Sequence, residues 1–71
     1  MEKVRLNARA AEAAIRRRGL KKRWLASQLG LPETDFGKVA RGQLLASMSV
    51  AKKFAALVNA DIADLLETEG R

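Results

Sequence analysis

The sequence contains no cysteine and no histidine among its 71 residues. It therefore excludes a disulfide scaffold and a zinc site built from Cys or His ligands. Catalytic groups that need a Cys nucleophile or a His base are excluded as well, so we expect no enzyme activity, no cofactor and no small-molecule ligand. The acids near the C-terminal end, Asp61, Asp64, Glu67 and Glu69, are spaced as an exposed helix face and a tail, which does not favour a metal site.

Long apolar runs are also missing, because no stretch approaches the roughly 18 residues that a membrane span needs. The first residues lack the uninterrupted apolar region of a secretory signal. We therefore expect one cytoplasmic domain over residues 1–71, with no membrane partner. A chain this short buries only about 60% of the surface of its unfolded form, so we expect its stability margin to be small.

Acidic residues are scarce in most of the chain. Residues 1–53 hold 13 Lys or Arg against 4 Asp or Glu, a local charge of +9, whereas residues 54–71 hold one Arg against 4 acids, a local charge of −3. Six of the cations lie within residues 16–23. This distribution is typical of a protein that binds a polyanion, and the alternative is a solvated basic surface that keeps the protein soluble.

Apolar residues recur at helical spacing along the chain, which predicts an all-α fold of five helices. No stretch alternates apolar and polar residues for long enough to predict a strand. The first helix is expected over residues 2–18, with Gly19 as its end. Its inner face carries small and branched apolar residues: Val4, Ala8, Ala11, Ala14 and Ile15.

Two short helices follow. The second is expected over residues 21–29 and ends at Gly30, because glycine adopts a left-handed conformation without strain. The third opens at Pro32, which is tolerated at a helix start, and ends at Gly42. Gly37 inside it costs about 1 kcal/mol relative to Ala, so we expect other contacts to hold this helix. The inward-facing apolar residues of the pair are Leu25, Leu29, Phe36 and Val39.

The last third of the sequence predicts two more helices. Either Ser47 or Ser49 can cap the fourth, and Asn59 can end it because Asn tolerates the left-handed conformation. Asp61 is expected to cap a short fifth helix, and residues 68–71 to form a frayed tail. The inward-facing residues of the two helices are Val50, Phe54, Leu57, Val58, Ile62, Leu65 and Leu66.

The second and third helices form a candidate helix-turn-helix over residues 21–42. Gly30 supplies the positive φ that the turn needs, Leu31 fills the core behind it, and Ala26 is small where the helices cross. In such a unit the first helix lies over phosphates, and the N-terminal turn of the second enters the major groove. The pattern therefore predicts double-stranded DNA as the partner, and with it a nucleoid-associated protein.

A set of residues within 20–42 matches a known pattern: Leu25, Ala26, Gly30, Leu31, Phe36, Val39 and Gly42. This run resembles the lambda-repressor-like family, which includes the Xre, Cro and phage repressor DNA-binding domains. Residues 58–66 resemble the entry to the fifth helix of that family. The resemblance implies a compact five-helix domain and a sequence-specific transcriptional regulator.

The resemblance also implies roles for individual residues. Those at positions that touch base edges are Glu33, Thr34, Asp35 and Lys38. Those expected to contact phosphates are Lys21, Lys22, Arg23, Arg41 and Gln43. Two of the reading positions hold acids, which can accept a hydrogen bond from cytosine N4 or can simply be favoured by the helix dipole. The chain departs from the family at Gly37, where a polar residue is usual, and at Ala40, where Glu is usual.

One such domain makes few base contacts, so we expect a two-fold homodimer on a palindromic operator. The candidate dimer surface consists of apolar residues in the loop before the fourth helix and in the last helix: Leu44, Leu45, Ile62, Leu65 and Leu66. Trp24 is expected to cover the second helix or to contact another subunit, with base stacking as the alternative.

Two other functions stay open from the sequence. The domain could be an antitoxin-like regulator or protein-interaction module on the same fold, which the acids Glu33 and Asp35 favour. The arginine-rich first helix could instead bind RNA or an anionic membrane without sequence specificity. Salt-dependent gel shifts with competitor separate these functions, because specific binding to DNA survives excess competitor and weakens steeply with salt.

Overall fold

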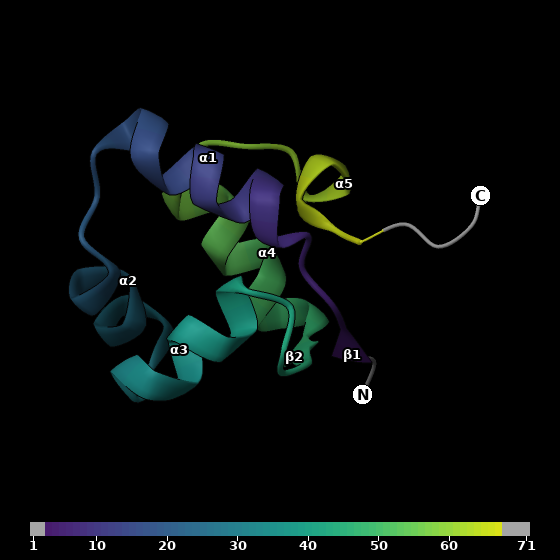
Figure 1. The fold of residues 1–71 in the computed structure, drawn as a ribbon, viewed down its shortest axis with the longest axis horizontal. Coiled ribbons are helices and arrows are strands. Elements are labelled where there is room, and N and C mark those ends of the chain that lie inside the picture. Colours follow the sequence, from purple (N-terminus) through teal and green to yellow (C-terminus); the bar gives the residue numbers. More distant parts are fainter. Residues whose placement is uncertain (1–2, 68–71) are drawn as a thin grey trace.

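Seven elements follow one another in the computed structural model, which describes residues 3–67. In chain order they are β1 (Lys3–Val4), α1 (Ala8–Arg18), α2 (Lys22–Leu29), α3 (Glu33–Ala40), β2 (Ala46–Ser47), α4 (Met48–Leu57) and α5 (Ile62–Leu65). The predicted helical fold is confirmed in outline, and a two-stranded sheet is added to it (Figure 1). Over the described part of the chain, no helix has the length and apolar character needed to cross a membrane.

The first helix begins at Ala8, and the predicted start at residue 2 is wrong. Asn7 caps α1: its backbone is extended and its Oδ1 accepts a hydrogen bond from the Ala10 amide at 2.9 Å. An asparagine at this position satisfies one of the amides that the first turn of a helix leaves without a partner. Val4 therefore belongs to a strand and not to the inner face of α1.

The extended segment before α1 pairs with the segment before α4. β1 and β2 are antiparallel, with Lys3 opposite Ser47 and Val4 opposite Ala46. Two residues are too short to show an alternating pattern, so the sequence analysis predicted no strand here. The pairing joins the start of the described chain to the end of the loop that follows α3.

The same segment is hydrogen-bonded on its other side near the end of α5. Leu6 forms an isolated antiparallel bridge with Leu66, and the Asn7 amide donates to the Leu65 carbonyl at 2.7 Å. Leu6 is 1% exposed and belongs to the core, which the sequence analysis missed. The segment over residues 3–7 thus lies between two distant parts of the chain.

Most predicted helix ends are confirmed. Gly30 has φ 71° and Asn59 has φ 56°, both left-handed. Of the two serines considered for α4, Ser47 is the cap, since its Oγ accepts from the Val50 amide at 3.2 Å. Asp61 stands at the N-cap position of α5 but makes no capping hydrogen bond with its side chain.

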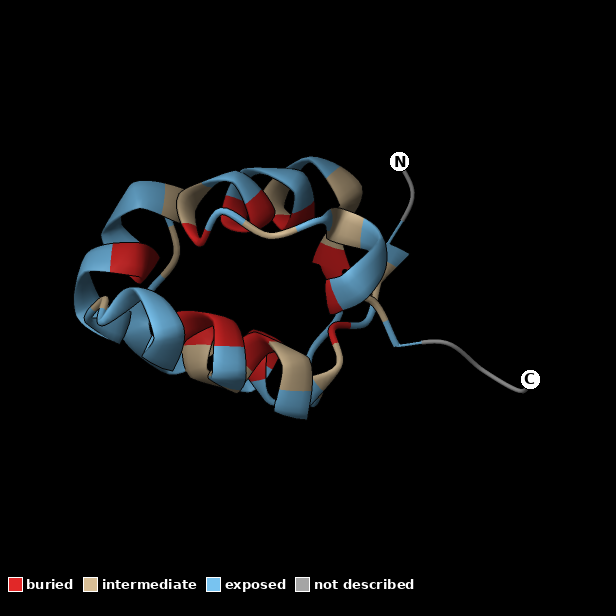
Figure 2. Cartoon of the chain, turned by 90° about the horizontal axis from the view of Figure 1, so that it is seen from above, coloured by how far each residue is buried: buried red, intermediate tan, exposed pale blue. Residues whose placement is uncertain are grey.

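The helices enclose one apolar core, and the buried residues lie on their inward sides (Figure 2). Phe36 of α3 and Phe54 of α4 meet at its centre, with ring centroids 5.8 Å apart and an interplanar angle of 64°. This edge-to-face geometry is one that aromatic pairs prefer. The contact fixes α3 against the body of the domain, with its opposite face toward solvent.

Candidate nucleic-acid interface

A turn over residues 30–32 sets α3 relative to α2. The Leu31 amide donates to the Ala26 carbonyl at 2.9 Å, and the Gly30 amide donates to the Ser27 carbonyl at 3.2 Å. This pair of bonds is the Schellman arrangement, which satisfies carbonyls at a helix end. Ala26 is 2% exposed, so α2 packs closely into the domain. α2 and α3 are therefore two short helices joined by a tight turn.

The two faces of α3 differ in character. Its buried residues are Phe36, Val39 and Ala40. Its exposed residues include Glu33, Thr34 and Lys38. A helix that is anchored by one apolar face presents the other to a partner, so the exposed side of α3 is the part of this unit that can enter a groove.

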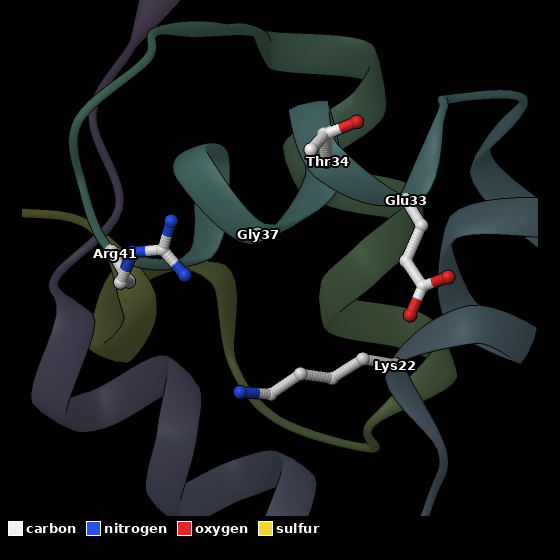
Figure 3. A pocket seen from close by; sticks show the side chains of 5 residues that line it. All are labelled: Lys22, Glu33, Thr34, Gly37 and Arg41. Atoms are coloured by element: carbon white, nitrogen blue, oxygen red, sulfur yellow. The ribbon is translucent and has the colours of Figure 1, made fainter.

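A pocket of about 420 Å³ lies beside this exposed face, between α3 and the start of α2 (Figure 3). We call it the α2–α3 pocket; it is lined by Lys22, Glu33, Thr34, Gly37 and Arg41. Residues 33, 37 and 41 share a face because they are four apart. Lys22 and Arg41 extend into the pocket from opposite sides. Four of the five lining residues were predicted to contact DNA, and Gly37 was not.

Two of the predicted DNA-binding cations are paired with carboxylates. Lys22 Nζ lies 3.1 Å from Glu12 Oε1, which links α2 to α1. Arg23 Nε lies 3.6 Å from Glu33 Oε1, which links α2 to α3. All four side chains are well exposed, and exposed ion pairs contribute at most about 1 kcal/mol. A phosphate can therefore replace the carboxylate partner at small cost.

Arg41 lies where two pockets meet. In addition to the α2–α3 pocket it lines a second one of about 440 Å³, the α1–α3 pocket, together with residues of α1 that include Arg9, Glu12 and Arg16. Its Nε donates to Gln43 Oε1 at 3.4 Å. The sequence analysis did not assign Arg9 or Glu12 to the site. Their spacing on the outward face of the first helix was the available signal.

The predicted base-reading residues do not all lie together. Glu33 and Thr34 line the α2–α3 pocket, and Lys38 is exposed on α3 but lines none of the pockets described here. Asp35 is half-buried and lines a separate groove. Two residues along a helix correspond to about 200° of rotation, which explains why Asp35 points away from Glu33. The grouping of Asp35 with Glu33 and Thr34 is corrected accordingly.

The three cations at the start of α2 border one further surface. Lys21, Lys22 and Arg23 line a pocket of about 430 Å³ together with Glu33. Lys21 stands at the N-cap position of α2 without a capping hydrogen bond from its side chain. The predicted phosphate-binding residues of α2 thus lie next to the exposed face of α3.

The predicted dimer residues divide into two groups. Leu44 and Leu45 are 41% and 42% exposed, and they line a groove of about 220 Å³, the leucine groove, to which Asp35 and Lys3 also contribute. Leu65 is 1% exposed, so its side chain belongs to the core and is removed from the candidate dimer surface.

Three other apolar residues are partly exposed. Ile62 and Leu66 are half-buried against the core. Trp24 is 44% exposed on α2.

Comparisons with known proteins identify the fold. No protein-family model and no curated protein matches this sequence. A similar solved structure is that of a "putative DNA-binding protein" from Bacteroides fragilis, with a TM-score of 0.72 and 24% sequence identity over 80% of this chain and 92% of that one. The chain shares the small helical fold of that protein.

Proposed function

We propose that this protein is a sequence-specific DNA-binding transcriptional regulator of the lambda-repressor-like (Cro/Xre) kind, which places α3 in the major groove. The observation that carries the proposal is the exposed face of α3, where Lys22 and Arg41 extend into one pocket beside Thr34. The solved structure that shares the fold is described as a "putative DNA-binding protein", which supports the same class of partner.

The charges around α3 match the two kinds of contact that DNA recognition needs. Cations bind phosphates and fix the orientation of the protein, whereas side chains in the groove read base edges. Lys21, Lys22 and Arg23 lie at the start of α2, where the first helix of such a unit crosses the phosphates. Thr34 and Lys38 lie on the exposed face of α3, which enters the groove.

The test begins with selection of bound sequences from a random DNA pool. Fluorescence anisotropy then measures affinity for the selected duplex and for random DNA at several salt concentrations. We expect specific binding that survives excess competitor and weakens steeply with salt. Lys22→Ala should weaken binding to all sequences and reduce the salt slope by about one, whereas Lys38→Ala should relax base preference.

Lys52→Ala is the matched control, because Lys52 is an exposed cation on α4 that lines none of the pockets described. This variant should change neither the affinity for DNA with its salt slope nor the base preference appreciably. Equal effects of Lys22→Ala and Lys38→Ala on selected and random DNA would contradict the assigned roles. Failure to enrich any sequence would contradict specific recognition.

The protein is proposed to bind its operator as a homodimer. The leucine groove supports this, since Leu44 and Leu45 are large apolar side chains at the surface of a small domain. Its charged lining residues have opposite signs, Lys3 and Asp35, which suits contact between two copies. Sedimentation of the protein with and without operator DNA tests the state. One monomer per site would contradict the dimer, and Leu45→Ser should shift the equilibrium toward monomer.

A protein-interaction or antitoxin-like role is the second candidate, and the exposed side chains of Trp24, Leu44 and Leu45 favour it. The two acids of α3 favour it less than the sequence suggests, because Glu33 is paired with Arg23 and Asp35 lies away from the α2–α3 pocket. A protein-interaction module would show no specific binding to DNA that survives excess competitor, so the same titrations distinguish the two roles.

A further inference from the structure

A side chain that starts beyond the end of α3 occupies the middle of its exposed face. Arg41 follows the last residue of α3, yet its guanidinium lies beside Gly37. A Cβ at position 37 would be 3.3 Å from Nη1 and 3.8 Å from Nη2 of Arg41. Side chains at the end of a helix lean toward its N-terminus, and four residues correspond to about 6 Å of helix. The positive charge is therefore one turn closer to the N-terminal end of α3 than its own Cα.

Gly37 provides the space for this arrangement. The backbone does not require glycine here, because the positive-φ glycines within residues 3–67 are Gly19, Gly30 and Gly42. Glycine inside a helix is also less favourable than alanine. The structural benefit that Gly37 offers in return is room for the guanidinium of Arg41 against the helix backbone.

The terminal nitrogens of the Arg41 guanidinium, Nη1 and Nη2, lie toward the α2–α3 pocket. Gln43 Oε1 accepts a hydrogen bond from Nε at 3.4 Å, whereas no hydrogen bond joins Nη1 or Nη2 to another residue of the described chain. Two parallel N–H groups of arginine match the O6 and N7 acceptors that guanine presents in the major groove. The arrangement supplies the donors at position 37, where α3 itself has no side chain.

We propose that Arg41 reads a guanine in the major groove through the space left by Gly37, and so sets base specificity instead of gripping a phosphate. The inference rests on the proposed function, because it requires α3 to enter the groove. Glu33, one turn before Gly37 on the same face, is placed to accept from the N4 of a cytosine in the same segment. The preferred site should therefore contain G·C pairs under this face of α3.

The experiment uses the full chain and the selected duplex, with each guanine replaced in turn by 7-deazaguanine, which lacks the N7 acceptor. At one position the replacement should weaken wild-type binding about fivefold or more. The same replacement should have no effect on Arg41→Ala. Arg41→Lys keeps the charge but not the planar fork, so it should retain affinity for random DNA within about twofold while losing the guanine preference.

Two variants at position 37 test the role of the space. Gly37→Leu should reduce the same preference, because its side chain fills the space of the guanidinium, whereas Gly37→Ala should have a smaller effect, because its Cβ would lie 3.3 Å from Nη1 and require only a slight shift of the Arg41 side chain. Their Tm should be no lower than that of the wild type, since both residues favour the helix; this separates loss of specificity from loss of fold. Arg18→Lys is the matched control, because Arg18 is exposed on α1 and lines none of the pockets described.

The outcomes distinguish the inference from the proposed function. If Arg41→Ala and Arg41→Lys weaken selected and random DNA equally, Arg41 is a phosphate contact and the inference is overturned, while the proposed function stands. If the selected site contains no guanine that responds to the replacement, the inference is also overturned. If the wild type binds no DNA, the proposed function itself fails.

Discussion

The two turns that bound α3 are both made by glycine with positive φ, yet different parts of the chain hold them. At the entry, Gly30 has φ 71°, and a Cβ added there would meet nothing within 4 Å. At the exit, Gly42 has φ 75°, and a Cβ would lie 2.9 Å from the backbone oxygen of Leu6. The Gly42 carbonyl also accepts from Arg5 Nη1 at 2.7 Å. The entry is a local turn, whereas the exit is packed against a segment from the other end of the domain.

This difference matters for the site because each turn carries different functional residues. The entry places the exposed face of α3 beside Lys22. The exit places Arg41 and Gln43 on either side of Gly42, and their side chains are joined by a hydrogen bond. The segment over residues 3–7 therefore helps to position the residues proposed to read or bind DNA, although it contributes none of them.

Gly42→Ala should have the largest effect on stability. The left-handed conformation costs an L-residue about 1–2 kcal/mol, and the contact with the Leu6 oxygen adds to this, so we expect a loss of about 3 kcal/mol in the free energy of unfolding. Urea titration followed by circular dichroism measures it. Gly42→Asn should recover only the backbone part of this loss, because asparagine tolerates the dihedral angles but its Cβ keeps the close contact with the Leu6 oxygen.

Gly30→Ala should cost less, about 1–2 kcal/mol, because only the backbone conformation is affected. Here Gly30→Asn should recover part of the loss, since asparagine adopts the left-handed region more readily. The same urea titrations compare the four variants. Equal losses at the two positions would show that the exit is not held by the N-terminal segment.

Arg5→Ala tests the hydrogen bond at the exit alone. The bond is exposed, so we expect a loss of only about 0.5 kcal/mol in the free energy of unfolding. Amide exchange should increase at Gln43, whose amide donates to the Lys38 carbonyl at 2.8 Å, and not at Leu31. An increase at both amides would mean that the effect is global and not confined to the exit.

Glu12→Gln tests the ion pair between Glu12 and Lys22. It should have the smallest effect on the free energy of unfolding, less than about 0.5 kcal/mol. Removal of the carboxylate that holds Lys22 should raise affinity for random DNA about twofold at low salt. Asp64→Asn on α5 is the matched control for net charge, because Asp64 is exposed and lines none of the pockets described. Equal gains from both changes would indicate general electrostatics instead of release of Lys22.

Short-range sequence patterns predicted much of the arrangement of helices and turns. α2 and α3 lie within a residue or so of their predicted bounds, because glycine turns and helical spacing depend on residues a few positions apart. The strand at Lys3–Val4 was missed because its partners, Ala46 and Ser47, are far along the chain. The burial of Leu6 has the same origin, since it depends on the bridge to Leu66.

The candidate site was predicted in composition but not in arrangement. Lys22, Thr34 and Arg41 were each identified, and the structure brings them to one pocket. The pairing of Lys22 with Glu12 could not be predicted, because it depends on how α1 packs beside α2. The guanidinium of Arg41 lies beside Gly37 because of the conformation of the Arg41 side chain. Helical spacing predicts only that this side chain leans toward the N-terminus of α3.

The bridge between Leu6 and Leu66 has a consequence for the order in which the domain is completed. During synthesis the segment over residues 3–7 is made before the rest of the described domain. The Glu67 amide donates to the Arg5 carbonyl at 2.9 Å, and Glu67 is made more than fifty residues later than this segment. Contacts so distant in sequence form slowly. The α2–α3 turn can form early, whereas the bridge between Leu6 and Leu66 can form only once the last described residues are present. Pulse-labelled exchange during refolding should accordingly protect the Leu31 amide before that of Glu67.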